Sequence, residues 1–296
     1  MEKKETEALT EGALCGEFYV GEGKKVRFSK GNLQFNAVQG THKILWDREE
    51  SPGTWRFAEH QWDVIGKDNK KISETYDGFI DLFGWATSGC ATDPWETSKK
   101  LEVYCFVDFG EDEDFDRDPE DKSVCTYGSG EDWGLYNAIS NGGDTPGKWR
   151  TLTGGEWEYL FWHNRWTLGR IEGMLCFLFI PEGVEVPAKV FSETYDEKSS
   201  SYLHEADYES NSFTEEQFKK YEELGVVALP CGGWRTGKKL KCVGEIGVYW
   251  SSSICDMEVA YTFCFGFDCD GDGFVDECDA SDHLFSGCSV RLVQDI

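Results

Sequence analysis

Phe18-Tyr-Val20, Lys25-Val-Arg-Phe28 and Asn32-Leu-Gln-Phe35 are three short apolar runs near the start of the chain, and glycines separate them. Aromatic and β-branched residues in short runs bounded by glycine predict strands joined by tight turns. Trp55-Arg-Phe57 and Trp62-Asp-Val-Ile65 continue the same pattern. The first part of the fold is therefore expected to be a meander or hairpin of short strands.

The composition of the whole chain agrees with this expectation. Its 296 residues are 40% hydrophobic and 15% aromatic, which is ample for a packed core. Twelve Trp, 12 Tyr and 20 Phe stand beside 33 Gly and only 3 Met. Such a mixture favours short strands and turns around aromatic anchors over a helical bundle. We expect an α+β domain in which strand and loop outweigh helix.

The charge of the chain argues against binding to nucleic acid. Fifty-six acidic and 29 basic residues give a formal net charge of -27. A surface this acidic repels phosphate backbones and anionic membranes. No stretch reaches the roughly 18 apolar residues of a membrane span, and Met1 to Thr10 lack the apolar centre of a secretion signal. We expect no membrane insertion, and the sequence leaves the localisation unknown.

A first helix is predicted after Trp149-Arg-Thr-Leu152. Thr153-Gly-Gly-Glu156 is a capping-box pattern, in which the Thr hydroxyl and the Glu carboxylate can each satisfy a free backbone N–H. The helix would then place Trp157, Leu160 and Phe161 on one core-facing side. Further along, the apolar run from Met174 to Pro181 is predicted as a buried strand.

A second helix is predicted by Thr214-Glu-Glu-Gln217, which again has the capping partner three residues after the cap. Phe218, Tyr221 and Leu224 follow at helical spacing, and Gly225 is expected to stop the helix. Every apolar segment of the chain is short and needs the others to bury it, so a single domain is expected.

Two segments are expected to lie outside the packed domain. Residues 1–17 are polar and Glu-rich, and they are predicted to form a flexible leader before a domain that covers 18–296. Residues 92–131 form an acidic insertion, in which Glu111 to Asp121 hold almost no apolar side chain. This insertion is predicted to be a solvated loop, with a cation site as the alternative.

Several ordered motifs resemble one known family. Phe28-Ser-Lys-Gly-Asn-Leu-Gln34, Asp81-Leu-Phe-Gly-Trp85, Gly232-Gly-Trp-Arg235, Gly247-Val-Tyr-Trp-Ser-Ser-Ser253 and Ser289-Val-Arg-Leu-Val293 carry the resemblance. Asp132-Trp-Gly134, Asn137 to Gly143 and Trp149 to Thr153 extend it. The chain resembles the major paralogous domain family of gut Bacteroidetes-type proteins, which includes the variable proteins of diversity-generating retroelements.

The resemblance covers about residues 18–296 and implies a C-type-lectin fold related to that of the formylglycine-generating enzymes. It implies two helices, short antiparallel strands and much irregular loop. Tyr249–Ser253 and Ser289–Val293 would be fixed strands, and a mutable segment of about residues 254–288 would lie between them. The aromatic anchors of this frame are expected to be Trp85, Trp133, Trp149, Trp157 and Trp250.

The mutable segment would display its variable side chains toward a ligand. Adenine-directed mutation of Asn codons can give most residues found between Ile254 and Cys288, although it cannot give Met257, Glu258 or Glu277. Those three are fixed scaffold, ordinary mutations, or a mark of a non-diversified relative. A surface loop of ordinary composition is the alternative. The expected ligand-contacting residues are Cys255, Asp256, Thr262, Cys264, Gly266, Asp268, Asp270, His283, Ser286 and Cys288.

An acidic pattern inside the segment raises calcium as the one candidate cofactor. Alternate oxygen ligands around a glycine bend are what a 12-residue calcium loop requires. The last position is Asp where an EF-hand has Glu, and no flanking helix is predicted. An acidic ligand-facing loop without metal is therefore the other interpretation. The candidate calcium ligands are Asp268, Asp270, Asp272, Asp276 and Asp279.

Catalysis is not expected. Five His residues are far apart, and no catalytic motif accompanies them. Cys288 is the one position worth testing for the copper-dependent chemistry of formylglycine-generating enzymes. The 12 Cys show no CxxC pair, and a disulfide such as Cys269 with Cys278 cannot be deduced. The family resemblance implies a receptor or adhesin, carried on a cell surface or phage particle, that binds a protein or glycan on another cell surface. A calcium-dependent lectin and an oxidase are the alternatives.

Overall fold

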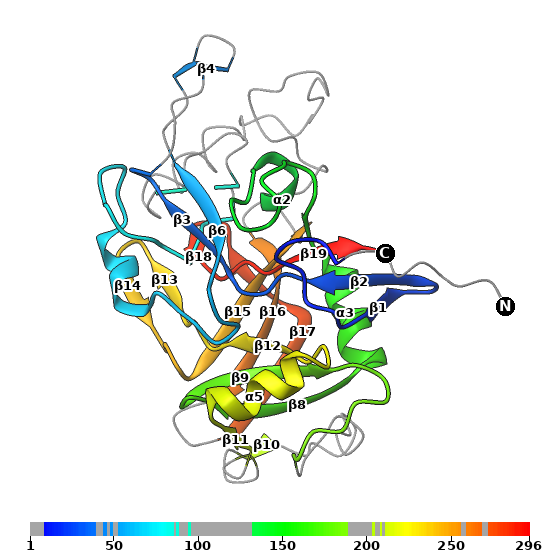
Figure 1. Cartoon of the computed structure of the whole chain (residues 1–296). Coiled ribbons are helices and arrows are strands. Elements are labelled where there is room, and N and C mark those ends of the chain that lie inside the picture. Colours follow the sequence, from blue (N-terminus) through cyan, green and yellow to red (C-terminus); the bar gives the residue numbers. More distant parts are fainter. Residues whose placement is uncertain are drawn as a thin grey trace, which may run out of the picture.

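A computed structural model gives the architecture of the chain (Figure 1). It describes residues 9–39, 44–45, 48–49, 53–85, 87–88, 94–95, 132–188, 203–204, 208, 211–255, 259–267 and 272–296. These residues form many strands and few helices, which confirms the α+β class. The predicted acidic insertion lies outside the described residues apart from positions 94–95. No helix within the described ranges is long and apolar enough to cross a membrane.

The sheet that contains the predicted variable segment is antiparallel, with the strand order β10-β17-β16-β15. Strand β16 lies between β15 and β17, and Tyr249 of β15 is opposite Phe263 of β16. The pairing of β16 with β17 is irregular between Tyr261 and Phe263. The bounds are Leu203–His204 for β10, Ile246–Ile254 for β15, Val259–Phe267 for β16 and Asp272–His283 for β17.

A second sheet joins the two ends of the described chain, in the order β1-β2-β19-β7. The last strand lies between the first hairpin and β7, so the C-terminus lies beside β2 (Figure 1). The predicted runs at Phe18 and Lys25 are the two strands of this hairpin. The bounds are Phe18–Gly21 for β1, Lys24–Phe28 for β2, Arg150–Thr151 for β7 and Leu292–Asp295 for β19.

A third sheet has the order β11-β8-β9-β12, and only its β11–β8 pair is parallel. Its strand β9 is the buried strand predicted before Pro181, and every residue of β9 after Met174 is buried. Helix α5 lies across this sheet in Figure 1. The bounds are Arg165–Ile171 for β8, Met174–Ile180 for β9, Ser212–Phe213 for β11 and Val227–Pro230 for β12.

Three smaller sheets complete the strands. The order β14-β13-β18 forms one, and β3-β6 and β4-β5 are two-stranded. Strands β3 and β6 confirm the predicted runs at Asn32 and Trp55. The bounds are Leu33–Asn36 for β3, Ile44–Leu45 for β4, Arg48–Glu49 for β5, Thr54–Phe57 for β6, Trp234–Thr236 for β13, Lys239–Lys241 for β14 and Ser286–Gly287 for β18.

Both predicted helices are present with their capping boxes. Thr153 precedes α3 (Gly154–His163), and Thr214 precedes α5 (Glu215–Glu222). Trp157, Leu160 and Phe161 of α3 are buried as predicted. On α5 the expected face is only partly right, because Leu224 follows the helix and is exposed. Two further short elements are η1 (Gly66–Lys71) and α2 (Trp133–Tyr136).

The side chains of the core form three clusters, which we name after a central residue. The Phe177 cluster includes Phe18, Phe28, Trp157, Phe177, Phe263 and Phe265. The Trp250 cluster includes Phe35, Phe83, Trp85, Trp133, Trp149, Trp250 and Leu292. The Phe218 cluster includes Trp62, Cys176, Leu178, Phe213 and Phe218. All five tryptophans predicted as core anchors are buried.

Two expectations about the first 65 residues are wrong. The packed domain begins before Phe18, because Leu14 is buried in the Phe177 cluster and its N–H donates to the carbonyl of Phe28 at 2.8 Å. The single apolar side chain of Leu14 thus attaches part of this Glu-rich stretch to the core. The run Trp62–Ile65 is not a strand. Trp62 instead packs edge-on against Phe218 of α5, with ring centroids 5.7 Å apart.

Candidate ligand-binding surface

Strand β16 is buried on both sides, because the sheet that holds it lies between two aromatic clusters. Successive side chains of a strand point to opposite faces. The odd-numbered Phe263 and Phe265 belong to the Phe177 cluster, whereas the even-numbered Ala260 belongs to the Trp250 cluster. The indole of Trp157 lies parallel to the Phe263 ring, with centroids 5.0 Å apart. Neither face of β16 is therefore fully exposed to solvent.

This burial contradicts the expected exposure of four predicted ligand-contacting residues. Thr262 and Gly266 are buried on the Trp250-cluster side of β16. Ser286 is buried in β18, opposite Thr236 of β13. Cys288 is buried in the Trp250 cluster, where its backbone exchanges two hydrogen bonds of 2.9 Å with that of Phe83. The exposed fractions are 1% for Thr262, 4% for Ser286 and 0% for Cys288.

The other predicted ligand-contacting residues have mixed outcomes. Cys255 is exposed and Cys264 is partly buried against the Trp250 cluster. His283 is the last residue of β17, and its backbone is opposite Val259 of β16. Its side chain is not among those that the structure describes. Three positions lie outside the described residues altogether: Asp256, Asp268 and Asp270.

The backbone of the candidate calcium ligands differs from the predicted loop. Asp272, Asp276 and Asp279 all lie in strand β17, and Asp276 is opposite Cys264 of β16. A strand rises about 3.3 Å per residue, so Asp272 and Asp279, which are seven residues apart, would be roughly 23 Å apart in a fully regular strand. A calcium loop instead turns sharply to place its ligands around one centre. The three residues therefore do not share the single turned loop that the sequence predicts.

Among the residues with described side chains, no group of three or more His, Cys, Asp or Glu residues could hold a metal ion. The side chains of Cys269 and Cys278, whose pairing the sequence leaves open, lie outside the described ones.

Among the residues whose exposure the structure describes, a group that reaches solvent lies where β15 ends and β16 begins. We call this surface the rim, and it comprises Ser252, Ser253, Ile254, Cys255, Val259 and Tyr261. Cys255 is exposed and the other five are half-buried. The N–H of Cys255 donates to the carbonyl of Val259 at 2.9 Å, so a hydrogen bond joins the residue after β15 to the first residue of β16.

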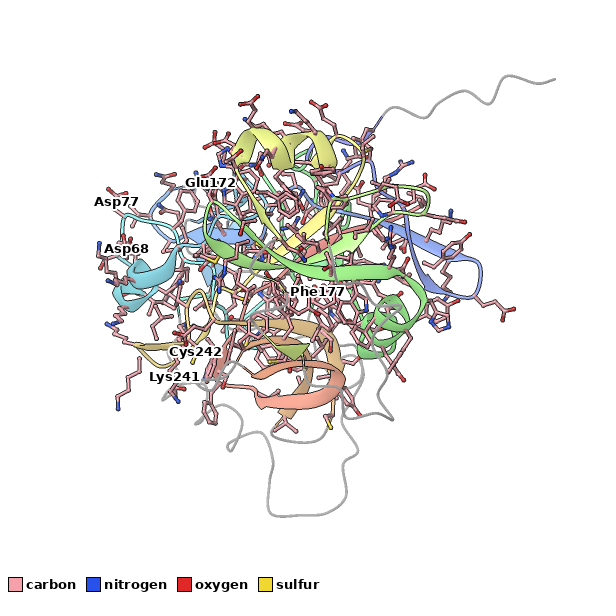
Figure 2. All side chains as sticks on the ribbon, turned by 90° about the horizontal axis from the view of Figure 1, so that it is seen from below. Asp68, Asp77, Glu172, Phe177, Lys241 and Cys242 are labelled. Atoms are coloured by element: carbon pink, nitrogen blue, oxygen red, sulfur yellow. The ribbon has the colours of Figure 1, made fainter. Side chains whose placement is uncertain are left out.

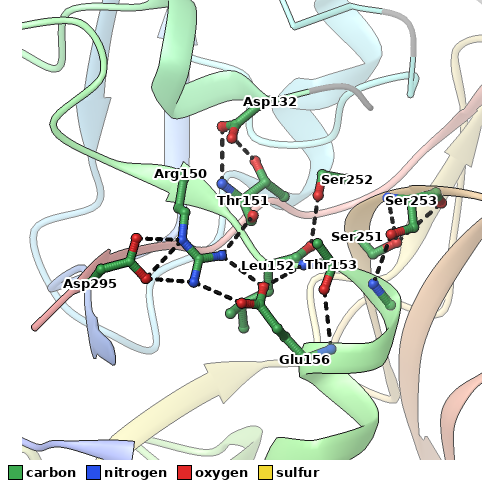
Figure 3. Close-up of polar contacts among 11 residues, drawn as sticks. Asp132, Arg150, Thr151, Leu152, Thr153, Glu156, Ser251, Ser252, Ser253 and Asp295 are labelled. Carbon is green, nitrogen blue, oxygen red and sulfur yellow. Dashed lines mark hydrogen bonds and ion pairs between the residues drawn. The ribbon is translucent and has the colours of Figure 1, made fainter. Parts of the chain in front are cut away.

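The rim is fixed to the start of helix α3. The N–H of Ser252 donates to the carbonyl of Leu152 at 2.8 Å, and the N–H of Gly154 donates to the Ser253 hydroxyl at 3.1 Å. A Cβ at Gly154 would lie 3.3 Å from the Tyr261 side chain, so the glycine permits this close approach. Figure 3 shows the three serines of β15 beside the cap of the helix.

An ion-pair clamp fixes the other side of the same helix start. Arg150 donates to Glu156 at 2.7 and 2.8 Å and to Asp295 at 2.7 Å, and it lies between the two carboxylates in Figure 3. Burial opposes ionisation of Arg150, but its hydrogen bonds to Asp295 and Glu156 outweigh burial and raise its pKa. The clamp ties β7, α3 and the C-terminal strand together.

A buried polar network holds the strands that bracket the segment. Arg291 is fully buried and donates to Asn32 at 3.3 Å and to Gln61 at 3.0 Å. The Tyr249 hydroxyl donates to the carbonyl of Pro230 at 2.8 Å and accepts from the Asn32 amide at 3.1 Å. Burial lowers the pKa of Arg291 to about 10. Asn32, Tyr249 and Arg291 lie in motifs that carry the family resemblance, whereas Gln61 does not, and the sequence predicted none of these contacts.

The bracketing strands themselves are directly hydrogen-bonded. The N–H of Trp250 donates to the carbonyl of Ser289 at 3.0 Å, and the N–H of Ser289 donates to the carbonyl of Val248 at 2.9 Å. The two bracketing strands are therefore adjacent, while the chain between them passes through the buried strand β16. Strand β19 begins at Leu292, three residues later than the sequence predicts.

Comparison with known proteins adds no family to this description. No family model, no curated protein and no solved structure matches the chain.

Proposed function

We propose that the chain is a ligand-binding protein, receptor-like or adhesin-like, that displays a diversified surface on a C-type-lectin scaffold. The observation that carries this proposal is the closed base of the segment. Ser289 is hydrogen-bonded to both Val248 and Trp250, which fixes the two bracketing strands to each other. Changes confined to solvent-facing side chains between these strands, such as that of Cys255, therefore need not disturb the frame. The resemblance of the motifs to variable proteins of diversity-generating retroelements supports the same function.

The rim is the described part of the proposed ligand surface. Cys255 is its exposed residue, and Val259 and Tyr261 expose part of their side chains. Contacts from α3 and β7 hold this backbone in place, which limits the entropy lost when a ligand binds. Asp256, Asp268, Asp270 and His283 remain in the proposal on sequence grounds. Thr262, Gly266, Ser286 and Cys288 support the frame instead of contacting ligand.

We propose binding rather than catalysis as the activity. A reactive thiol must be accessible and have a stabilised thiolate. Cys288 is wholly buried, so its thiol does not meet the requirement of access. A calcium-dependent lectin is the alternative proposal, and calorimetry with calcium on the wild type and on Asp272→Ala tests it.

The encoding locus provides the first test of diversification. We expect a near-identical second copy of the last 150 or so bases beside a reverse transcriptase gene, with mismatches confined to adenines of the template. Mismatches spread over all four bases would overturn the proposal that this copy is diversified.

A display library provides the test of ligand binding. Cys255 and Val259 would be randomised together on the otherwise intact chain and selected against a panel of bacterial surface proteins and glycans. We expect selected variants to bind different panel members while their melting temperatures stay within a few degrees of the wild type. A library whose members mostly unfold, or whose binders never differ in target, contradicts a recognition surface here.

A further inference from the structure

Six exposed lysines gather at the far end of β15 from the rim, five on two neighbouring elements and one in the turn before β14. Helix η1 contacts strand β14, and Figures 1 and 2 both show the two side by side. Strand β15 has nine residues, so its ends are roughly 26 Å apart. We call this group the lysine patch, and it comprises Lys67, Lys70, Lys71, Lys238, Lys239 and Lys241.

The lysine patch concentrates positive charge on a protein that is strongly acidic as a whole. The chain has only 29 basic residues against 56 acidic ones, yet six of the basic residues lie here. Among the described residues, Lys71 is the one member with a carboxylate partner, Asp68 at 3.0 Å. Like charges on neighbouring elements are unfavourable, and an anion bound between η1 and β14 would offset this cost.

An aromatic ring borders the patch. Trp234 of β13 is opposite Lys241 of β14, and the Lys241 ammonium lies 5.6 Å from the indole centroid. Trp234 packs partly against the Trp250 cluster, so its ring position is fixed while part of it remains accessible. A held ring beside an ammonium group suits a ligand with both a flat C–H face and a negative charge, such as an acidic sugar.

The surroundings favour a polysaccharide over a protein or a nucleic acid. A protein interface needs buried apolar anchors at its centre. None of the large exposed apolar side chains in the described part of the chain lies on η1, β13 or β14. DNA carries one charge per about 1.7 Å, so a chain with net charge -27 repels it strongly. A polymer with sparser charges avoids most of this repulsion.

We propose that the lysine patch binds polysaccharides whose sugars carry carboxylate groups. The lysines pair with the carboxylates, and the Trp234 ring contacts a sugar face. This site is separate from the rim, so one molecule can hold an acidic glycan and a rim ligand at once.

Binding of oligogalacturonate to the full chain, measured by calorimetry with EDTA present, tests this proposal. The variant Lys70→Gln/Lys239→Gln/Lys241→Gln removes three charges of the patch. The control Lys24→Gln/Lys148→Gln/Lys220→Gln removes the same charge from exposed lysines elsewhere. We expect the patch variant to bind about tenfold more weakly and the control to change less than about twofold. Trp234→Ala is expected to weaken binding while the salt dependence is retained.

Each result has a clear meaning. Wild-type binding that weakens with salt and is absent for neutral maltooligosaccharides supports the proposal. Equal losses in the two lysine variants, or no wild-type binding to oligogalacturonate, overturn it. Tighter binding to oligo(dT) than to oligogalacturonate overturns it as well. All the substituted lysines are exposed, and melting curves check that every variant folds.

Discussion

Ala260 and Val259 are neighbours on β16 that should respond very differently to the same substitution. Ala260 is fully buried in the Trp250 cluster, whereas Val259 is half-buried at the rim. Ala260→Asp places an unpaired carboxylate among aromatic side chains, which costs about 3 to 5 kcal/mol. Val259→Asp loses only part of one aliphatic contact, about 1 kcal/mol. The low strand propensity of Asp affects both variants and cancels in the comparison.

Urea unfolding followed by tryptophan fluorescence, together with melting temperature, measures the difference. At about 2 °C per kcal/mol for a chain of this size, Ala260→Asp should melt about 6 to 10 °C below the wild type and Val259→Asp about 2 °C below. Equal destabilisation, or the reverse order, would refute the assignment of the two faces of β16 and with it the location of the rim.

Four further results are expected. Burial raises the pKa of Asp81 to about 6, so between about pH 4 and pH 6 the folded state keeps a proton that the unfolded chain has lost. Stability should therefore fall as pH rises through that window, and guanidinium titrations should show this component vanish in Asp81→Asn. Thr153→Ala removes half of the α3 capping box and should cost about 1 kcal/mol in urea unfolding. Arg150→Gln leaves two carboxylates without their cation and should cost about 1 to 2 kcal/mol, less in 1 M salt. Maleimide labelling of the native protein, located by mass spectrometry, should modify the exposed Cys15 and Cys255 and spare the buried Cys176, Cys231 and Cys288 until denaturant is added.

The sequence predicted the frame well because local chemistry determines much of it. A capping box involves residues three apart, so Thr153 and Thr214 marked both main helices without knowledge of the rest of the fold. Trp133, Trp157 and Trp250 were predicted as core because such large side chains are the natural anchors of short strands. The motif resemblance also identified the two bracketing strands, although β19 begins only at Leu292.

The predicted site was less accurate because burial depends on packing across sheets. Thr262 and Ser286 are small polar residues typical of a surface, and nothing near them in sequence shows that β16 and β18 are covered. The Asp-rich stretch after Phe267 matched a calcium loop in spacing, yet pairing with β16 extends Asp272–His283 into a strand. Lys67 and Lys239 are far apart in sequence, so their common surface was not foreseen.

The hydrogen bond from the Cys255 N–H to the Val259 carbonyl has a practical consequence for engineering. It holds the end of β15 and the start of β16 close together, so a guest peptide inserted between these two residues would begin and end at a preformed stem. Lengthening such a connection twofold costs only about 0.6 kcal/mol of closure entropy. The protein could therefore carry epitopes or affinity tags of different lengths there, and serve as a carrier for foreign sequences.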